Sequence, residues 1–333
     1  MREAVVVGVD VGGSKILAGA VSGQGAVLHR VRLVTPGGVG APSLVEEALV
    51  EAVGSLQAAY EVTAIGIGAA GWVDRDGEVV RFAPHLPWRE EPLAARLQDR
   101  LGVPVWLDND ANTGALAELR LGAARHRAEM LFLTLGSGIG GAQVSGGRVV
   151  RGAHGLAGEF GHMPVVPAGR DCPCGGRGCW EQYASGDALV REARELVARG
   201  SPDAVVMREF VGDDSDRLTG EVVTAAAERG DPAAMEAVRR VGEWLGVGIG
   251  GLCAGLDPEL VVVGGGVSQA GDLLLGPARA ALSQTLPGRG FRPVPPIVAA
   301  ALGADASMVG AALMAGARGS AGSASEQPRS PAQ

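Results

Sequence analysis

The chain has 333 residues, of which 47% are hydrophobic, and this is enough for about two domains with sizeable cores. Its 29 basic and 37 acidic side chains give a net charge of −8, which argues against a nucleic-acid partner because such proteins concentrate positive charge. No apolar run approaches the ~20 residues of a membrane span, and the opening MREAVVVGVD lacks signal-peptide features. We therefore expect a cytoplasmic protein with no membrane partner.

The first half of the chain alternates strands and helices. Three β-rich runs broken by glycine turns predict an antiparallel meander over residues 4–34. The apolar spacing beyond it predicts a helix over 41–60, a strand over 63–68, a helix over 91–101, a strand over 103–107 and a helix over 111–121.

The same pattern then begins again with EMLFLTLGSGIGGAQVSGGRVV (129–150). The elements predicted after it are helices over 188–198, 221–229 and 233–256, a strand over 260–263, a helix beyond GGGVSQAGD, a strand at PIVAA (296–300) and a helix over 307–317. Two halves that each open with a three-stranded meander predict a duplicated α/β fold with the ligand in an interdomain cleft. Residues 318–333 have the composition of a disordered tail.

Two glycine turns occupy matching places in the two halves: DVGGSK (10–15) and TLGSGIGG (134–141). Glycine lets a backbone approach a phosphate closely, and the serine hydroxyls and Lys15 add donors and charge. Asp10 is placed to hold Mg²⁺ directly or through water. Either turn alone is equally well explained as a plain hairpin, but the pair favours a nucleotide site.

A third glycine run, VVVGGGVSQAGD (261–272), ends a predicted strand and could place a nucleoside against backbone. It lacks the spacing of the GxGxxG dinucleotide fingerprint, and plain strand–helix packing would also account for it. The residues assigned to the nucleotide are Asp10, Gly12, Gly13, Ser14, Lys15, Thr134, Gly136, Ser137, Gly138, Gly140, Gly265 and Gly266.

Three polar residues, Asp108, Asn109 and Asp110, follow a buried strand where a helix begins. A helix N-cap accounts for one of them. A carboxylate at a helix N-terminus is held ionised, as a general base requires, and phosphoryl transfer to an alcohol needs such a base beside bound Mg²⁺. We assign the base to Asp110 and the orientation of the acceptor to Asn109, with Asp108 as the second candidate for the base.

Three of the four cysteines lie within CPCGGRGCWE (172–181). In a reducing compartment such a cluster favours metal ligands over disulfides. Cys253, within EWLGVGIGGLCAGL, is expected to be a buried apolar residue.

Six motifs together resemble the ROK family of sugar kinases and related repressors, from about Val5 to Ala317: DVGGSK, GIGAAGWVD, DNDAN, TLGSGIGG, GEFGH and CPCGGRGCWEQYASG. The resemblance is greatest to the bacterial glucokinases of that family. It implies the actin-like (ribonuclease H-like) ATPase fold. The domains expected from it are a small one formed by 1–109 and 305–317 and a large one formed by 110–304 with a zinc loop at 159–181.

The resemblance also implies site residues. Asp110 matches the catalytic base. The positions that match sugar contacts are Gly71, Asn109, Asp110, Glu159, His162 and Glu181, and those that match zinc ligands are His162, Cys172, Cys174 and Cys179. A closed Cys₃His set is structural, so zinc would clamp the sugar-facing groups that flank it. Ser14 and Ser137 replace the family's threonines, Ala70 a proline, and His85 an asparagine.

The activity implied is ATP-dependent phosphorylation of D-glucose at O6 to glucose 6-phosphate and ADP, with Mg²⁺ and structural Zn²⁺. Two carboxylates and an amide favour a neutral hexose, which leaves an N-acylhexosamine, fructose or allose as alternatives. Polyphosphate is an alternative donor. A sugar-sensing regulator without kinase activity is a further alternative, disfavoured because the first predicted strand begins by residue 4. Family members commonly form homodimers, so we expect a homodimer or larger homo-oligomer.

Overall fold

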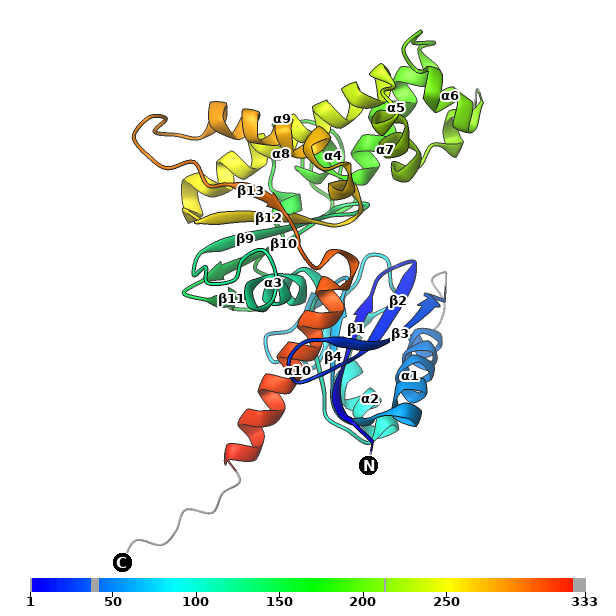
Figure 1. Cartoon of the computed structure of the whole chain (residues 1–333), viewed down its shortest axis with the longest axis vertical. Coiled ribbons are helices and arrows are strands. Elements are labelled where there is room, and N and C mark those ends of the chain that lie inside the picture. The colour runs from blue at the N-terminus through cyan, green and yellow to red at the C-terminus, as the bar shows by residue number, and fades with distance from the viewer. Residues whose placement is uncertain (1, 37–41, 213, 326–333) are drawn as a thin grey trace, which may run out of the picture. The chain divides into compact units, whose positions relative to one another are not determined.

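The computed structural model describes residues 2–36, 42–212 and 214–325, and the chain divides into two compact units. The first consists of Met1–Arg125, Val149–Ala157 and Asp305–Gln333, and the second of His126–Arg148 and Gly158–Ala304 (Figure 1). The sequence predicts a large domain that begins at residue 110. Residues 110–125 instead belong to the first unit, because their helix packs against the C-terminal helix of that unit.

A five-stranded mixed sheet forms the centre of the first unit. Its order is β3-β2-β1-β4-β8, with β1–β2 and β2–β3 antiparallel and β1–β4 and β4–β8 parallel. The predicted meander is thereby confirmed. The strands are β1 (Ala4–Val11), β2 (Lys15–Val21), β3 (Val27–Val34), β4 (Glu61–Ala69) and β8 (Val105–Asn109).

Helices cover this sheet. Side chains of α1 (Pro42–Ala59) and α2 (Leu93–Leu101) share one core with Val7 and Val9 of β1. The opposite side of β1 contacts α10 (Ala306–Ser325), which also packs against α3 (Asp110–Arg120). Glycine makes this approach possible, since a Cβ on Gly8 or Gly66 would overlap a backbone carbonyl of α10.

A small antiparallel sheet, which the sequence analysis does not predict, also belongs to the first unit. It consists of β5 (Trp72–Val73), β6 (Val80–Phe82) and β7 (Arg89–Glu91). The Arg89 guanidinium donates to the carbonyls of Ala83, Leu86 and Trp88, so it pins the loop between β6 and β7.

The second unit repeats the sheet of the first. Its order is β11-β10-β9-β12-β13, with β9–β10 antiparallel and β9–β12 and β12–β13 parallel. The repetition confirms the duplicated α/β architecture expected of an actin-like fold. The strands are β9 (Met130–Leu135), β10 (Ile139–Ser145), β11 (Arg148–Val150), β12 (Leu260–Gly264) and β13 (Ile297–Ala299).

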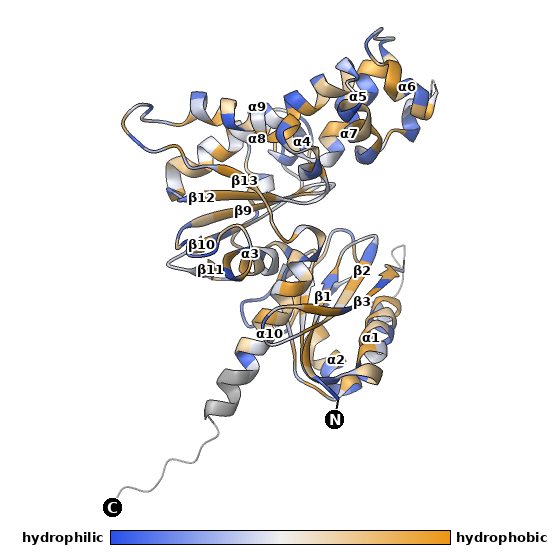
Figure 2. Ribbon diagram, in the orientation of Figure 1, coloured by the Kyte–Doolittle hydropathy of each residue, from blue (hydrophilic) through white to orange (hydrophobic). Residues whose placement is uncertain are grey.

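The helices of the second unit bury the apolar side of β9, β12 and β13 (Figure 2). The longest of them, α8, lies along α9 and contains the fully buried Cys253, as predicted (Figure 1). The helices are α4 (Glu181–Ala184), α5 (Gly186–Ala198), α6 (Val205–Val211), α7 (Gly220–Glu228), α8 (Pro232–Leu256) and α9 (Asp272–Thr285). Short 3₁₀ helices span Phe160–His162, Ser215–Arg217, Gly266–Ala270 and Gly303–Asp305.

The C-terminal helix α10 continues to Ser325, beyond the point at which the sequence predicts a disordered tail. Arg318 donates to the carbonyl of Asp76, which fixes this part of the helix to the first unit. Residues 326–333 of the predicted tail, and residue 41 of the predicted helix over 41–60, lie outside the described residues.

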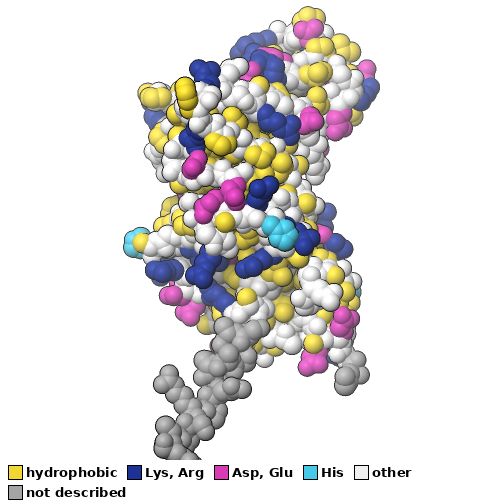
Figure 3. Space-filling view, turned by 60° about the vertical axis from the view of Figure 1, so that its left-hand side comes forward, with side chains coloured by type: hydrophobic (Ala, Val, Ile, Leu, Met, Phe, Trp, Pro, Cys, Tyr) yellow, Lys and Arg dark blue, Asp and Glu magenta, His cyan; other side chains and the backbone are white. Residues whose placement is uncertain are grey.

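Acidic and basic side chains are intermixed on the face shown in Figure 3. Exposed ion pairs in the described structure include Arg81–Glu90 and Arg229–Glu209. Among the described helices, none combines the length and the apolar character needed to cross a membrane.

Candidate active site

The first glycine turn joins β1 to β2 and is held by backbone hydrogen bonds. Gly12 N donates to the Lys15 carbonyl at 3.0 Å, and the Thr35 hydroxyl donates to the Gly12 carbonyl at 2.7 Å. A Cβ on Gly13 would lie 2.7 Å from the Cβ of His85, so the pinned β6–β7 loop backs the turn. The turn is therefore a rigid element with Lys15 at its far end.

Asp10 precedes this turn at the end of β1. Burial raises the pKa of its carboxyl above the usual value, and a hydrogen bond from Ser307 and the charge of Lys15 oppose that rise. A cation beside the carboxylate would favour the ionised form. Oxygen is the donor that Mg²⁺ prefers, so Asp10 fits the role of a magnesium ligand.

The three polar residues at the end of β8 have different surroundings. Asp108 is 5% exposed and accepts from the Arg151 guanidinium, at 2.8 Å from Nε and 2.5 Å from Nη2. It also accepts from Asn112 Nδ2 at 2.8 Å. These contacts occupy the carboxylate and balance its charge, so Asp108 stabilises the fold and is poorly suited to take a proton from a substrate.

Asn109 is the N-cap of α3. Its Oδ1 accepts from the backbone N–H groups of Ala111 and Asn112, and its Nδ2 donates to the Gly71 carbonyl at 3.1 Å. Asp110 is the first residue of the helix and is partly exposed. A carboxylate there is stabilised by the helix dipole, as the sequence analysis expects of a general base.

The predicted residues of the first unit gather at one edge of its sheet. Asp10 pairs with Gly68 on β4, and Ala69 pairs with Asn109 on β8. Because β1, β4 and β8 are parallel, their carboxyl ends meet at this edge, where ligands bind in open α/β sheets. Gly71 lies just beyond β4, where a Cβ would stand 2.6 Å from the Phe82 carbonyl oxygen.

The second glycine turn borders a cavity of about 400 Å³ within the second unit. Of the predicted nucleotide residues, Gly136, Ser137 and Gly266 line it. Gly265 lies against Leu135 with a φ of 85°, and its Cβ would stand 2.5 Å from the Leu135 backbone. The Gly186 N–H donates to the Gly136 carbonyl at 2.7 Å and so ties the start of α5 to the turn.

Some residues that line this cavity are not among those predicted from the sequence. Helix α7 and the start of α5 contribute Asp187, Gly220, Glu221, Thr224 and Glu228. The available signal is a face of α7 on which Glu221, Thr224 and Glu228 recur at helical spacing after the Thr219 cap. Solvated helix surfaces show the same pattern, so it would not by itself have indicated a ligand.

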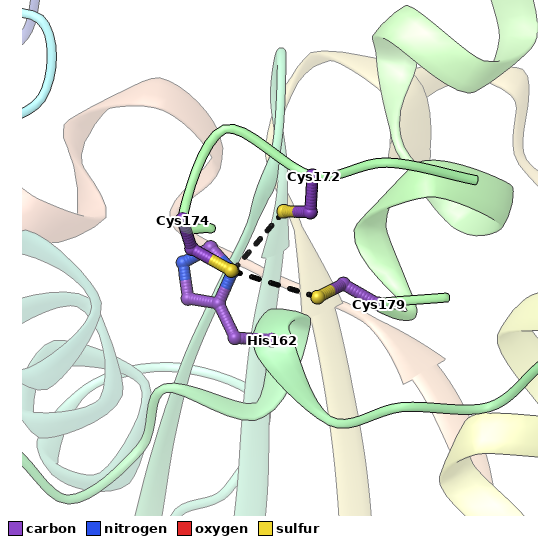
Figure 4. Close-up of side chains that lie close together, drawn as sticks. All are labelled: His162, Cys172, Cys174 and Cys179. Carbon is purple, nitrogen blue, oxygen red and sulfur yellow. Dashed lines mark hydrogen bonds between the residues drawn. The ribbon is translucent and has the colours of Figure 1, made fainter. Parts of the chain in front are cut away.

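The cysteine motif forms a compact cluster with His162 (Figure 4). One ligand atom from each of His162, Cys172, Cys174 and Cys179 lies within 4.8 Å of the others. The Cys174 and Cys179 sulfurs are 3.7 Å apart, as are Cys172 Sγ and His162 Nδ1. Two thiolates at ~2.3 Å from one tetrahedral zinc would be about 3.8 Å apart, so the four residues fit a closed Zn²⁺ site.

The pKa values of the cysteine thiols in the cluster are shifted in different directions. Burial raises the pKa of the Cys172 thiol, whereas the backbone N–H of Gly176 lowers that of Cys174. Zinc binds thiolates, so it would release the protons that burial otherwise retains.

The predicted sugar-facing groups of the second unit surround the cluster. His162 Nδ1 lies 3.5 Å from Glu181 Oε1, and Nε2 lies 3.8 Å from Glu159 Oε2. Nδ1 is thus the nitrogen that faces the cysteines, and Nε2 is directed toward Glu159. A Cβ on Gly138 would stand 2.7 Å from Glu181 Oε2, so the predicted zinc loop at 159–181 (the metal loop below) directly adjoins the second glycine turn.

The repeated sheet, the two glycine turns and the Cys₃His cluster define a protein of the actin-like ATPase fold. Residues 6–318 match the ROK family, and the chain belongs to that family.

Relatives match over nearly the whole chain. A protein named glucokinase from Streptomyces coelicolor is 41% identical over 93% of this chain and 97% of its own length. A Thermotoga maritima protein of the same name is 35% identical over 94% of this chain and 97% of its own. The crystal structure of a ROK family glucokinase from Streptomyces griseus, in complex with glucose and AMPPNP, has a TM-score of 0.88 and 41% identity. It covers 94% of this chain and 99% of that one.

Proposed function

We propose that this protein is an ATP-dependent glucokinase, which transfers the terminal phosphoryl group of ATP to O6 of D-glucose and releases glucose 6-phosphate and ADP. The relatives named glucokinase support this assignment. The observation that carries it is the contrast between two neighbouring acids. Arg151 neutralises Asp108, whereas Asp110 lies partly exposed at the N-terminus of α3, at the sheet edge that also presents Asp10.

In this reaction Asp110 accepts the proton of the sugar hydroxyl as the hydroxyl attacks. Asn109, held by its cap and by Gly71, fixes the start of α3 and orients the acceptor. Asp10 would hold Mg²⁺, which neutralises phosphate charge when it is bound with ATP. Lys15 and the Ser14 hydroxyl add a charge and a donor at the phosphates.

The second unit supplies the groups that recognise hydroxyls. His162, Cys172, Cys174 and Cys179 would hold Zn²⁺ as a structural ion. With Nδ1 on the metal, Nε2 is a donor of fixed tautomer beside Glu159. We assign Glu159, His162 and Glu181 to the sugar, because two carboxylate acceptors and one imidazole donor suit the hydroxyls of a neutral polyol. The two carboxylates would repel an acidic or phosphorylated sugar.

The donor is assigned from the cavity beside the second turn. Three carboxylates, those of Asp187, Glu221 and Glu228, line it together with small residues of the turn. A polyphosphate chain would meet repulsion there, whereas the hydroxyls of the uncharged nucleoside of ATP can donate hydrogen bonds to these carboxylates. Competition between ATP and polyphosphate for turnover measures this preference directly.

The test is an ADP-release assay with glucose, mannose, fructose, allose and N-acetylglucosamine. We expect the highest kcat/KM with glucose, and Asp110→Asn is expected to lower kcat by about 10²–10⁴-fold, the contribution of a positioned base. Asp99→Asn, an exposed acid on α2, is the matched control and should retain full activity. Near-full turnover by Asp110→Asn would remove the base assignment, and a preference for another sugar would replace glucose by that sugar.

A further inference from the structure

A tyrosine hydroxyl outside the ligand set binds the backbone of the metal loop. The backbone N–H of Arg170 donates to Tyr183 Oη, on α4, at 2.9 Å. Gly169 permits this approach, since a Cβ on it would stand 2.3 Å from the same oxygen. The hydroxyl therefore contacts the loop two residues before the proposed zinc ligand Cys172.

The backbone of Arg170 extends this contact to the other end of the cysteine segment. The Arg170 carbonyl accepts from the N–H of Gly178 at 2.7 Å. Gly178 has a φ of 73°, in the left-handed region that favours glycine, and it immediately precedes Cys179. Two successive hydrogen bonds thus connect α4 to the parts of the loop that precede Cys172 and Cys179.

The ring of Tyr183 is itself held by α8. It packs against the Trp244 ring, with centroids 4.9 Å apart and an interplanar angle of 43°. Trp180 Nε1 donates to the Trp244 carbonyl at 2.8 Å, so the residue that precedes α4 is fixed to the same part of α8. Removal of the hydroxyl alone should therefore leave the ring in place.

The side chain of Arg170 makes separate contacts. Its guanidinium carbon lies 5.5 Å from the centroid of the Tyr183 ring, and Nη2 is 3.3 Å from Glu192 Oε1 on α5. The bond to Tyr183 Oη uses the backbone N–H instead, which every residue type except proline provides. Mutation can therefore separate the two contributions.

Helix α4 also carries Glu181, one of the acids assigned to the sugar. Glu181 lies two residues before Tyr183, and its Oε1 is 3.5 Å from His162 Nδ1. One helix of four residues thus contacts the loop through one side chain and presents an acid through another. The placement of the proposed zinc ligands and that of Glu181 therefore depend on the same short element.

We propose that Tyr183 is a positioning residue of the metal loop. Its hydroxyl holds the segments that bear Cys172 and Cys179 at a fixed place relative to α4, and so couples zinc binding to the placement of Glu181. The inference rests on the proposed function, since the roles of the zinc ligands and of Glu181 are part of it.

The test compares Tyr183→Phe, which removes the hydroxyl and keeps the ring, with Arg170→Gln, which removes the guanidinium and keeps the backbone N–H. Tyr60→Phe, at the only other tyrosine of the chain, is the matched control. Zinc affinity is measured by competition with a chromogenic chelator in the absence of substrates. In addition, kcat and KM with glucose and ATP are measured at saturating zinc and at free zinc buffered near the dissociation constant of the unaltered protein.

Tyr183→Phe is expected to bind zinc about tenfold more weakly, the effect of one lost hydrogen bond, and to bind one ion per chain when zinc is in excess. At buffered zinc, its KM for glucose should exceed that of the unaltered protein by about three- to tenfold, with kcat within about twofold. Saturating zinc should remove this difference in KM, whereas a general defect of the fold would persist in the loaded protein. Arg170→Gln and Tyr60→Phe should keep the zinc affinity within about twofold, because both retain the hydroxyl and the N–H that it accepts from.

Unaltered zinc affinity in Tyr183→Phe would overturn the inference, and so would a raised KM for glucose that saturating zinc does not restore. A weakening by Arg170→Gln equal to that by Tyr183→Phe would overturn the assignment to the hydroxyl. An unaltered protein that binds no zinc would overturn the Cys₃His assignment and the inference with it. Absence of ADP release by the unaltered protein with every sugar would instead overturn the proposed function, and the chelator competition would still decide whether Tyr183 positions the zinc ligands.

Discussion

The two units present the same hairpin at the end of their first strand, yet the surroundings of the two turns differ. Asp10 and Lys15 bring charge to the first turn, which is backed by Ser307 of α10 and by the pinned loop that carries His85. The second turn brings glycine and Ser137 to a cavity. It is backed by the metal loop through the contact between Gly138 and Glu181.

This difference shows how two copies of one sheet and hairpin can present different functional groups. Asp10 stands one residue before the pair Val11–Ile16 that closes the first hairpin, and Thr134 stands one residue before the matching pair Leu135–Ile139. One position thus bears a carboxylate and the other a hydroxyl. Under the proposed function, the first hairpin would take the cation and phosphates, and the second would leave room for the nucleoside.

The largest expected effect comes from removal of the charge that distinguishes the first turn. Asp10→Asn should lower kcat by about 10²–10⁴-fold, because Mg²⁺ at the phosphates contributes several kcal/mol in the transition state. The matched change in the second turn, Thr134→Val, should alter kcat by less than about threefold, as expected for the loss of one uncharged hydroxyl. Steady-state kinetics at saturating MgATP measure both, and equal losses would contradict the division of roles.

The role of the metal loop behind the second turn can be tested by removal of one proposed zinc ligand. Cys174 is exposed, so Cys174→Ala removes a ligand with little loss of packing. We expect zinc content below one ion per chain and a rise in KM for glucose of about 10–100-fold, since Glu159, His162 and Glu181 lose their common anchor. Cys253→Ala, which alters a cysteine outside the cluster, should retain full zinc by elemental analysis. Equal zinc in the two variants would disprove the Cys₃His assignment.

The smallest expected effect comes from alanine substitutions at two glycines of the second turn, Gly138 and Gly136. A Cβ on Gly138 would stand 2.7 Å from Glu181 Oε2, whereas around Gly136 nothing lies within 4 Å of that position. Gly138→Ala should therefore raise KM for glucose by about tenfold through the displaced carboxylate. Gly136 lines the cavity, so Gly136→Ala should raise KM for ATP instead. A change in the same constant for both would show that the turn does not separate the two substrates.

Regular patterns made the fold predictable. The β-rich runs and glycine turns, repeated from residue 129, predict both meanders and the duplication, which the sheet orders confirm. The small sheet β5–β7 was missed, because strands of two or three residues show no periodicity. The tail was predicted to start too early, since composition does not register the hydrogen bond from Arg318 to Asp76.

Within the candidate site, local sequence identified the residue types but could not rank them. Asp108 and Asp110 are equivalent by pattern, and the structure distinguishes them because Arg151, 43 positions away, donates to Asp108 through Nε and Nη2. Similarly, nothing near the glycine motifs indicates that α7 lines the cavity. Contacts between distant segments decide both points.

The position of α10 has a consequence for biosynthesis. The helix covers β1 and β4 through glycines that admit no methyl group, yet among the described elements it follows the whole second unit in the chain. During translation, the sheet that presents Asp10 and Asp110 therefore lacks the helix that covers it until the whole second unit has been made. A nascent chain would therefore complete the proposed cation site at Asp10 only after the second unit has been made.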